Sequence, residues 1–431
     1  MRISDNLKQL LSLEGAAYVA ELYRQLLDRE PDPGGHAHHT ELLEAGMSKL
    51  ELAARILQSP ESIDRNHMND EAPPTGWYRA VEDWYKHANL ASARYMPIES
   101  GPYPVPAHPR GLDDRYLDNF QDYLRQRTPW PQFVCIVPGG RAVGNHGSVL
   151  TPDRRLLWDI SAEYNIAPES HSVLQLRRLP PMTYRADTVA VVTTAGPYNY
   201  FHWMFDVLPR FELLRRYGIH VDAYMINRGD GVYPYQDETL HALGIPIELQ
   251  INCRSETHLK AKQLVVSSMA GYSGHPPEWA SRFLRQKLMV DRNIQPLPGR
   301  RRIYVSRSGA GYRRILNEAE LAGTLQSFGF TTVWLERLSV AEQAQLFVSA
   351  EMIVSPHGAG LTNLIFCQPG TKIVELLSPN YINGLYWIIS GHMKLEYWHL
   401  VGVAASNLSY EDYSIPIGAV EQVMRAIGCR C

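Results

Sequence analysis

From Phe133 almost to the end of the chain, short apolar strand patterns alternate with amphipathic helix patterns. The strand-like segments are FVCIVPGG, DTVAVVTT, DAYMIN, IELQIN, KQLVVSS, RIYVS, TTVWLE, EMIVSP and KIVELL. Helical patterns separate them, for example at about 200–217 and 235–243. This alternation predicts parallel sheets with helices on both faces, and the Pro-rich break at 293–301 divides it into two α/β units.

Three local signals refine this outline. The stretch GSVLTPDRRLLWDIS predicts a hairpin that turns at 152–153. Asn317 with Glu320 has the spacing of a helix-capping pair, and so does Ser339 with Glu342. We therefore expect one helix to begin after Asn317 and another after Ser339.

The first 132 residues have a different character. YVAELYRQLL and KLELAARILQ carry apolar residues at helical spacing, and the Pro-bearing NDEAPPTGW closes this block. PIESGPYPVPAHPRG at 97–111 is too rich in Pro and Gly for a core element, so we interpret it as a connector. The expected parts are a helical accessory domain (1–66), a linker and packing segment (67–132), two α/β domains (133–292 and 293–402) and a C-terminal segment (403–431).

Composition matters chiefly for what it excludes. A formal net charge of -3 over 431 residues gives no general attraction to nucleic acid, so an anionic ligand must meet a local positive cluster. The five cysteines lack paired spacing, which argues against a disulfide framework and a structural zinc site. With no apolar signal core and no run of about 18 apolar residues, we expect a cytoplasmic protein whose membrane contact is peripheral at most.

The stretch VSPHGAGLTNLIFCQPGTKIVEL at 354–376 predicts a strand, a glycine-containing turn, a short helix and a second strand. Gly358 and Gly360 would let the backbone approach a ligand, and the helix beginning near Leu361 would offer free N–H groups to a phosphate. Glu375, at the end of the next strand, could accept hydrogen bonds from ribose hydroxyls. The alternative is a tight turn with purely local geometry and a solvated carboxylate.

Arginines gather in GRRRIYVSRSGAGYRRILNE, around the first strand-to-helix loop of the same unit. Guanidinium groups form planar, charge-assisted bonds to a diphosphate and keep their charge when desolvated. Arg307 follows the strand directly and is the first candidate, with Arg313 and Arg314 further along the loop. The arginines at 300–302 fit a solvated strand entry better.

Four polar residues recur at steps of three or four in GPYNYFHWMFDVLPRFELLRRYG: Asn199, His202, Asp206 and Arg210. This spacing puts them on one face of a helix that is otherwise aromatic and aliphatic. Pro209 predicts a kink or an end of that helix. The stripe is either a buried hydrogen-bonded network or part of an active site.

Together these stretches resemble the motif series of glycosyltransferase family 61, through NYFHWMFDVLPR, YVSRSGAGYRRILNE and SVAEQAQLFVSAEMIVSPHGAGLTNLIFCQPGTKIVEL. The N-terminal block is similar to the bacterial domain of unknown function 4214, although GHAHHT departs from its pattern. The resemblance implies a GT-B fold, with two Rossmann-like doubly wound parallel-sheet domains facing a cleft. It also implies an inverting enzyme that uses a nucleotide sugar, and a role in bacterial surface polysaccharide synthesis.

An inverting transfer needs a base for the acceptor hydroxyl and positive groups for the leaving diphosphate. We expect Asp206 to be the base, with His202 as the alternative, and Asn199 and Arg210 in support. The expected donor-binding residues are Arg307, Arg313, Arg314, Asn317, His357, Gly358, Ala359, Gly360, Leu361, Asn363 and Glu375. No Asp-x-Asp occurs in the sequence, so we expect no essential metal or other cofactor, only a UDP-linked sugar donor.

The expected partners are the nucleotide sugar and a glycan or lipid-linked glycan acceptor, with no nucleic acid. Association with the inner face of the cytoplasmic membrane and homodimer formation are left open. Two other functions compete with the transferase. GAGLTN could belong to a dinucleotide-dependent oxidoreductase, but it lacks the third glycine. A non-catalytic carbohydrate-binding or scaffolding protein could share the fold, but it would need neither the arginine loop nor the polar stripe.

Overall fold

The computed structural model describes residues 10–27, 29–57, 59, 71–88, 90–101, 103–112, 114–229, 231–299, 301–405 and 412–429. The chain divides into two compact units. Unit 1 consists of Met1–Pro74 and Gln175–Thr183, and unit 2 of Thr75–Leu174 and Tyr184–Cys431. Among the described residues, no helix is both long enough and apolar enough to cross a membrane.

Unit 1 is helical, with α2 (Gly15–Leu27), α3 (Pro33–Glu44) and α4 (Lys49–Leu57). At the start of helix α3, Asp32 accepts a hydrogen bond from the Gly35 N–H, and Pro33 occupies the first helical position. The apolar residues of α2 and α4 form a core of their own, which includes Leu22 and Leu52. The helical patterns predicted here are thus helices that bury a common face.

Unit 2 contains a ten-stranded sheet in its first half. The strands are β1 (Gly76–Tyr78), β2 (Arg94–Ile98), β3 (Gln132–Pro138), β4 (Arg141–Val143), β5 (Ser148–Leu150), β6 (Arg155–Leu157), β7 (Thr183–Val191), β8 (Ala223–Ile226), β9 (Gln250–Asn252) and β10 (His258–Ser267). Their order is β1-β6-β5-β4-β10-β7-β8-β9, with β3 on β10 and β2 on β3. The predicted hairpin is confirmed, with Leu150 opposite Leu156.

The expectation of a parallel sheet in the first half is confirmed only in part. Strands β7, β8 and β9 are parallel. In contrast, β3 and β4 each pair antiparallel with β10, and β5 pairs antiparallel with both β4 and β6. The reason is loop length, because connections of a few residues, such as 144–147 between β4 and β5, can join only antiparallel strands.

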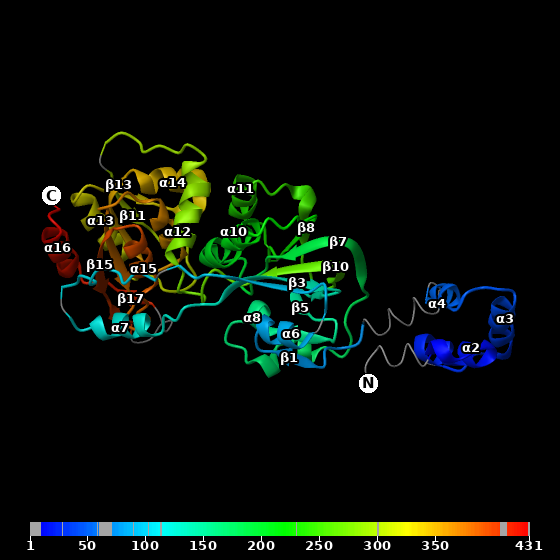
Figure 1. Ribbon diagram of the computed structural model, residues 1–431. Helices are drawn as coiled ribbons and strands as arrows, with labels where there is room; N and C mark the ends of the chain where they lie inside the picture. Colours follow the sequence, from blue (N-terminus) through cyan, green and yellow to red (C-terminus); the bar gives the residue numbers. More distant parts are fainter. Residues whose placement is uncertain are drawn as a thin grey trace. The chain divides into compact units, whose positions relative to one another are not determined.

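The second half of unit 2 contains a five-stranded parallel sheet in the order β12-β11-β13-β14-β15. Its strands are β11 (Arg301–Val305), β12 (Phe330–Val333), β13 (Ala350–Pro356), β14 (Lys372–Leu377) and β15 (Glu396–Val401). Helices α13 (Glu318–Ser327), α14 (Val340–Val348), α15 (Leu385–His392) and α16 (Ile417–Ala426) surround it (Figure 1). This mixed α/β architecture is compatible with a GT-B-like fold.

The two predicted helix caps differ in outcome. Ser339 and Glu342 form a complete capping box at the start of α14. Asn317 precedes α13 but makes no side-chain cap bond. Its amide instead donates to the Ile415 carbonyl and accepts from the Ile415 N–H, at 2.8 and 3.0 Å. Asn317 therefore holds the C-terminal segment, because this partner satisfies both ends of its amide.

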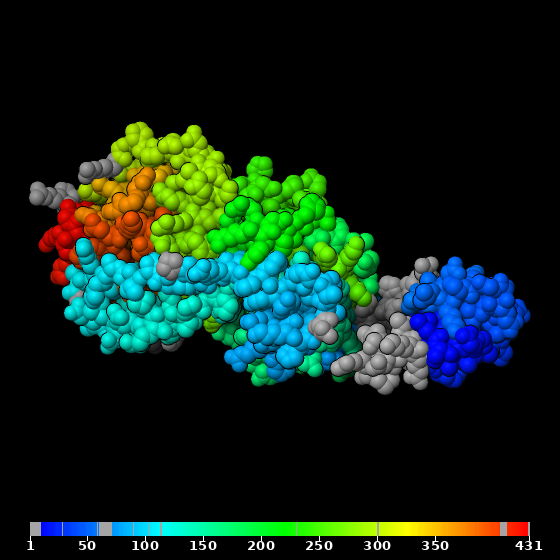
Figure 2. Space-filling model, viewed as in Figure 1, coloured from blue at the N-terminus to red at the C-terminus, as the bar shows by residue number. Residues whose placement is uncertain are grey.

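The segment from 99 to 131, which we call the crossing segment, leaves the first sheet after β2 and returns to it at β3. In between it packs on the second half of unit 2 through α7 (Leu117–Arg125), and Figure 2 shows this cyan stretch extending over that half. Phe120 lies edge-on against Trp387 at 5.5 Å, and the Trp387 indole donates to the Ala107 carbonyl. β1, α6 (Val81–Ala88) and β2 lie in the same predicted linker and packing segment, so its described residues from Thr75 onward form part of unit 2.

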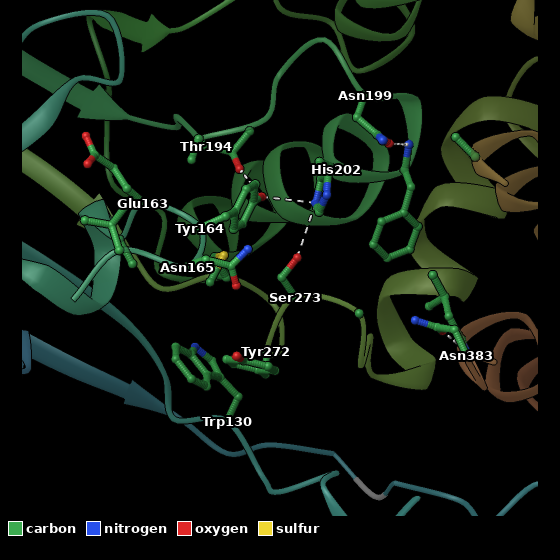
Figure 3. Close-up of a pocket in the computed structure, with 18 of the residues that line it drawn as sticks. Trp130, Glu163, Tyr164, Asn165, Thr194, Asn199, His202, Tyr272, Ser273 and Asn383 are labelled. Carbon is green, nitrogen blue, oxygen red and sulfur yellow. Dashed lines mark hydrogen bonds between the residues drawn. The ribbon is translucent and has the colours of Figure 1, made fainter. Parts of the chain in front are cut away.

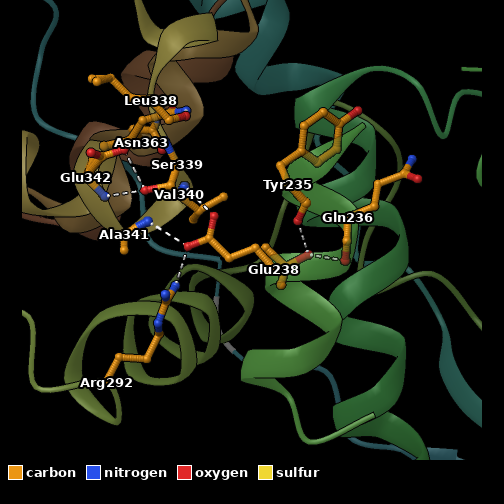
Figure 4. A network of polar contacts seen from close by, with 12 residues as sticks. Tyr235, Gln236, Glu238, Arg292, Leu338, Ser339, Val340, Ala341, Glu342 and Asn363 are labelled. Atoms are coloured by element: carbon orange, nitrogen blue, oxygen red, sulfur yellow. Dashed lines mark hydrogen bonds and ion pairs between the residues drawn. The ribbon is translucent and has the colours of Figure 1, made fainter. Parts of the chain in front are cut away.

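A carboxylate on α11 (Pro234–Ala242) joins the two halves of unit 2. Glu238 accepts from the N–H groups of Val340 and Ala341, at 2.6 and 2.9 Å, at the start of α14. Arg292, which follows α12 (Glu278–Arg285), donates to the same carboxylate at 2.9 Å (Figure 4). A negative charge at a helix N-terminus interacts favourably with the helix dipole, so this contact fixes α14 against the first half.

Candidate active site

A cavity of about 780 Å³ lies between the two halves of unit 2 (Figure 3). The first half lines it with side chains that follow β6, β7 and β10, and the second half with side chains that follow β11, β13 and β14. The principal residues are Trp130, Tyr164, Asn199, His202, Tyr272, Ser273, Arg313, His357, Gly358, Ala359, Tyr381 and Asn383. Ligands of α/β proteins commonly bind at the carboxyl ends of strands, where most of these residues lie.

The polar stripe enters this cavity through an irregular helix. Helix α9 (Tyr200–His202) continues into a π-helical turn, η3 (Trp203–Val207), and then into α10 (Leu208–Arg216). Pro209 has no N–H to donate to the preceding turn, and the helix widens where that bond is missing. The predicted disturbance at Pro209 is confirmed as a π turn rather than an end of the helix.

His202 and Asp206 form a hydrogen-bonded pair, with the His202 Nδ1 atom 2.7 Å from the Asp206 Oδ2 atom. The Asp206 side chain is only 4% exposed and lies behind the histidine, whose side chain is 25% exposed and lines the cavity. If Asp206 accepts the Nδ1 proton, the other ring nitrogen, Nε2, keeps a lone pair. Of the two, His202 is therefore the residue that can receive a proton from a bound ligand.

Two hydroxyl groups complete this arrangement, and neither was predicted from the sequence. The Tyr164 and Ser273 hydroxyls donate to Asp206 Oδ2 at 3.0 and 2.9 Å, and both also lie within 3.2 Å of His202 Nδ1. Burial and the neighbouring Asp206 raise the pKa of Tyr164, so its phenol stays protonated and can donate. These bonds hold the carboxylate and orient the histidine.

The opposite wall carries a second histidine and carboxylate. His357 follows β13 and places Nδ1 at 2.5 Å from the Glu375 Oε1 atom, while Tyr397 donates to Glu375 Oε2 at 2.6 Å. Glu375 is completely buried and does not line the cavity. The expectation that Glu375 would contact a ribose is thus corrected: its two oxygens are occupied by His357 and by Tyr397 of the neighbouring strand.

The arginine loop supplies positive charge at this wall. Arg313 lines the cavity, and its guanidinium lies between the rings of Tyr312 and Tyr381, 4.7 Å from each centroid. Arg307 lies against Gly358 and lines a second cavity, of about 470 Å³. Burial and then the nearby Arg313 lower the pKa of Arg307, and its Nε is buried with no hydrogen-bond partner among the described residues. An anion bound nearby would stabilise the positive charges of both Arg307 and Arg313.

Of the remaining expected donor residues, Gly358 and Ala359 line the main cavity, but the others do not: Arg314, Asn317, Gly360, Leu361 and Asn363. Arg314 pairs with Asp412 through Nη2 at 2.7 Å and, like Asn317, holds the C-terminal segment. Leu361 is completely buried, and Gly360 lines only the second cavity. The helix that contains them is a 3₁₀ helix, η7 (Ala359–Phe366).

Asn363, Arg210 and Asn199 form hydrogen bonds that hold elements of the fold in place. Asn363 is fully buried; its Oδ1 accepts from Tyr200 at 2.9 Å and its amide donates to Gln343. Arg210 is buried and donates to the carbonyls of residues 191, 193 and 267, which braces the ends of β7 and β10. Asn199 caps α9 by accepting from Phe201 N–H, and it also lines the cavity.

Comparison with known proteins identifies this region. The family model described as Glycosyltransferase 61 matches residues 200–374. This stretch contains His202, Asp206 and His357 and ends one residue before Glu375. The chain thus contains a glycosyltransferase 61 domain at residues 200–374. The model described as Domain of unknown function (DUF4214) matches residues 4–66.

Part of the chain is similar to curated proteins that are named as glycosyltransferases. Protein O-linked-mannose beta-1,4-N-acetylglucosaminyltransferase 2 of Canis lupus familiaris is 29% identical over 234 residues, 47% of this chain and 39% of the dog protein. A beta-1,2-xylosyltransferase of Arabidopsis thaliana is 27% identical over 129 residues, 27% of this chain and 23% of the plant protein. The chain thus matches about two fifths of the dog relative's length and less of the plant relative.

Within the described residues of unit 1 and unit 2, no group of three or more His, Cys, Asp or Glu side chains is placed to hold a metal ion. Metal independence of the glycosyltransferase 61 domain stays a prediction, which rests on the missing Asp-x-Asp.

Proposed function

We propose that this protein is an inverting glycosyltransferase that transfers a sugar from a nucleotide diphosphate sugar to a glycan acceptor. The observation that carries the proposal is the arrangement of one cavity. A histidine backed by a buried carboxylate lines one wall, and Arg313 with a second histidine lines the other. A base on one side and positive charge on the other are what an inverting transfer requires.

In this proposal His202 is the base. Its Nε2 takes the proton of the acceptor hydroxyl, and the hydroxyl oxygen forms the new bond to the anomeric carbon. The bond from that carbon to the phosphate oxygen breaks, and the nucleotide diphosphate leaves with the electron pair. Asp206, expected to be the base itself, orients His202 and stabilises its positive charge, because its own carboxylate is buried behind the ring.

The leaving diphosphate would lie against Arg313, His357 and the backbone around Gly358. Arg307 contributes positive charge from behind Gly358, since its guanidinium is in contact with that residue. Charge-assisted hydrogen bonds from guanidinium groups match phosphate oxygens in geometry and remain charged after desolvation. This arrangement supports a donor with a diphosphate, and we expect UDP as the nucleotide.

The relatives give the substrate class, in the words of their names. The dog protein is an N-acetylglucosaminyltransferase acting on O-linked mannose, and the plant protein is a xylosyltransferase. We infer that the donor sugar here is a hexose derivative or a pentose and that the acceptor is a glycan. Synthesis of a bacterial surface polysaccharide is the biological role we propose.

Calorimetric titration with UDP, GDP, ADP and dTDP tests the donor half of this proposal. Arg307→Ala should weaken binding of the preferred nucleotide by about 1.5–3 kcal/mol, roughly 10- to 150-fold, the scale of a hydrogen bond to a charged group. Arg425→Ala is the control, since Arg425 lies on α16 and its side chain is 71% exposed. Unchanged affinity in Arg307→Ala, or binding of NADH in place of these nucleotides, would contradict the proposal.

A further inference from the structure

The cavity wall that carries His202 also carries an aromatic pair that the proposed chemistry does not use. Trp130 and Tyr272 both line the cavity, and their ring centroids are 5.7 Å apart with an angle of 46° between the planes. Tyr272 is 54% exposed. Figure 3 shows the two rings together below Ser273 and His202. We call Trp130 and Tyr272 the aromatic platform.

The fold fixes the platform in place. Trp130 lies two residues before β3 and Tyr272 five residues after β10, and these strands pair antiparallel, with Val134 opposite Ser267. The side-chain amide of Gln132, the first residue of β3, also donates to the Ala270 carbonyl at 2.8 Å, three residues after the end of β10. The two rings are therefore held at the end of one ladder, and the platform exists before any ligand binds.

The loop that carries Tyr272 is anchored on both sides of the ring. Its next residue, Ser273, donates to Asp206 and so belongs to the candidate catalytic group. His275 N–H donates to the Tyr272 carbonyl at 2.8 Å, and the His275 ring stacks on Tyr123 at 4.3 Å. Tyr123 in turn donates to the Gly274 carbonyl. A loop held by these contacts thus joins the aromatic platform directly to the group that orients the base.

We propose that the aromatic platform is the acceptor subsite and binds the apolar face of a pyranose ring. A pyranose has a C–H face that packs on aromatic rings and hydroxyl groups at its edge for hydrogen bonds, and exposed aromatic side chains in a polar cavity suit such a ligand. The platform lies on the wall of the base, where the acceptor hydroxyl must be. The positive groups for the diphosphate line the opposite wall. This inference rests on the proposed function and names where its second substrate binds.

Saturation-transfer NMR with methyl pyranosides tests the platform directly. The panel is methyl β-D-glucopyranoside, methyl β-D-galactopyranoside, methyl α-D-mannopyranoside and methyl β-D-xylopyranoside, each with and without saturating UDP. The wild-type protein should transfer saturation to the ring C–H protons of at least one glycoside. Tyr272→Ala and Trp130→Ala should each weaken that glycoside at least tenfold, while Tyr272→Phe should retain it because the ring remains.

Tyr184→Ala is the matched control, since Tyr184 on β7 is 55% exposed but does not line the cavity. UDP affinity, measured by calorimetry, should be the same in all variants and shows that they are folded. The proposal is overturned if no glycoside receives saturation, or if both alanine variants bind glycosides as well as the wild type does. It is also overturned if the two alanine variants no longer bind UDP but still bind the glycosides, because the platform would then be the binding site of the nucleobase. Failure of the wild type to bind any nucleotide would instead count against the proposed function.

Discussion

The guanidinium of Arg307 occupies the space in which a side chain at Gly358 would begin. A Cβ atom built on Gly358 would overlap with Arg307 Nη1, and its next neighbour would be Arg307 Cζ at 2.8 Å. The backbone of Gly358 is extended, so its conformation does not by itself require glycine. Glycine is needed at position 358 because the Arg307 guanidinium leaves no room for a side chain. The arginine loop and the glycine-containing turn, which are separate motifs in the sequence, are therefore in contact.

Gly358→Ala should therefore act mainly by displacing the Arg307 guanidinium, which is the end of a flexible side chain. We expect nucleotide affinity to fall about as far as in Arg307→Ala, and the free energy of unfolding to change by less than about 1 kcal/mol. Gly311→Ala is the control, because a Cβ there meets no atom within 4 Å. A folded Gly358→Ala protein with normal nucleotide affinity would show that Arg307 is not needed in its present position.

His202→Ala, Asp206→Asn and the double variant separate the base from its orienting group. If His202 is the base, each single variant should lose turnover by roughly 100-fold to 10,000-fold, and the double variant should be little worse, since the two act as one unit. Steady-state rates with a fixed donor and acceptor give these ratios. A mild loss in His202→Ala beside a severe one in Asp206→Asn would return the role of base to Asp206.

Glu238→Ala should loosen the contact between the halves of unit 2. The variant leaves the Val340 and Ala341 N–H groups without their carboxylate and leaves Arg292 without its partner, so we expect a loss of about 1–3 kcal/mol of stability. All nine tryptophans lie in unit 2, so urea unfolding followed by fluorescence reports on this unit. Glu421→Ala, which removes an exposed carboxylate from α16, should change stability by less than 0.5 kcal/mol, roughly.

Asp159 should make unit 2 less stable as the pH rises. Burial raises the pKa of Asp159 to about 7, although its hydrogen bonds from Val81 N–H oppose this. A carboxyl group with a raised folded-state pKa contributes most stability below its unfolded pKa of about 3.9 and loses that contribution up to about pH 7, at about 1.4 kcal/mol per unit. Asp159→Asn should thus gain stability relative to the wild type between pH 4 and pH 8, as measured by urea unfolding. The prediction would be wrong if the free energies of unfolding of Asp159→Asn and the wild type differed by the same amount at pH 4 and at pH 8.

Exhaustive treatment with EDTA should leave most of the transfer activity. This expectation comes from the missing Asp-x-Asp, which would hold a donor-bound metal, and from the arginines that would neutralise the diphosphate instead. Activity is measured before and after chelation and after addition of manganese. Complete loss on chelation that manganese restores would demonstrate a metal requirement.

Residues close in sequence could be predicted, and residues brought together by the sheets could not. His202 and Asp206 are one helical turn apart, so their spacing alone paired them. Tyr164 and Ser273 come from distant loops, and no periodicity connects them to Asp206. The burial of Glu375 depends on β15, which the predicted strands do not include. With Tyr397 on that strand, β14 becomes an interior strand and Glu375 is covered. The antiparallel part of the first sheet depends on short loops, because the apolar pattern of a strand does not give its direction.

The crossing segment has a consequence for the order in which the protein can be completed during synthesis. The Ala107 carbonyl in this segment accepts a hydrogen bond from the indole of Trp387, which lies 280 residues later in the sequence, and Phe120 packs on the same ring. A ribosome therefore exposes this segment long before its partners exist. Until α15 has been synthesised, Phe120 must remain exposed to solvent or pack against other residues. The second half of unit 2 can therefore complete its folding only after nearly the whole polypeptide has been made.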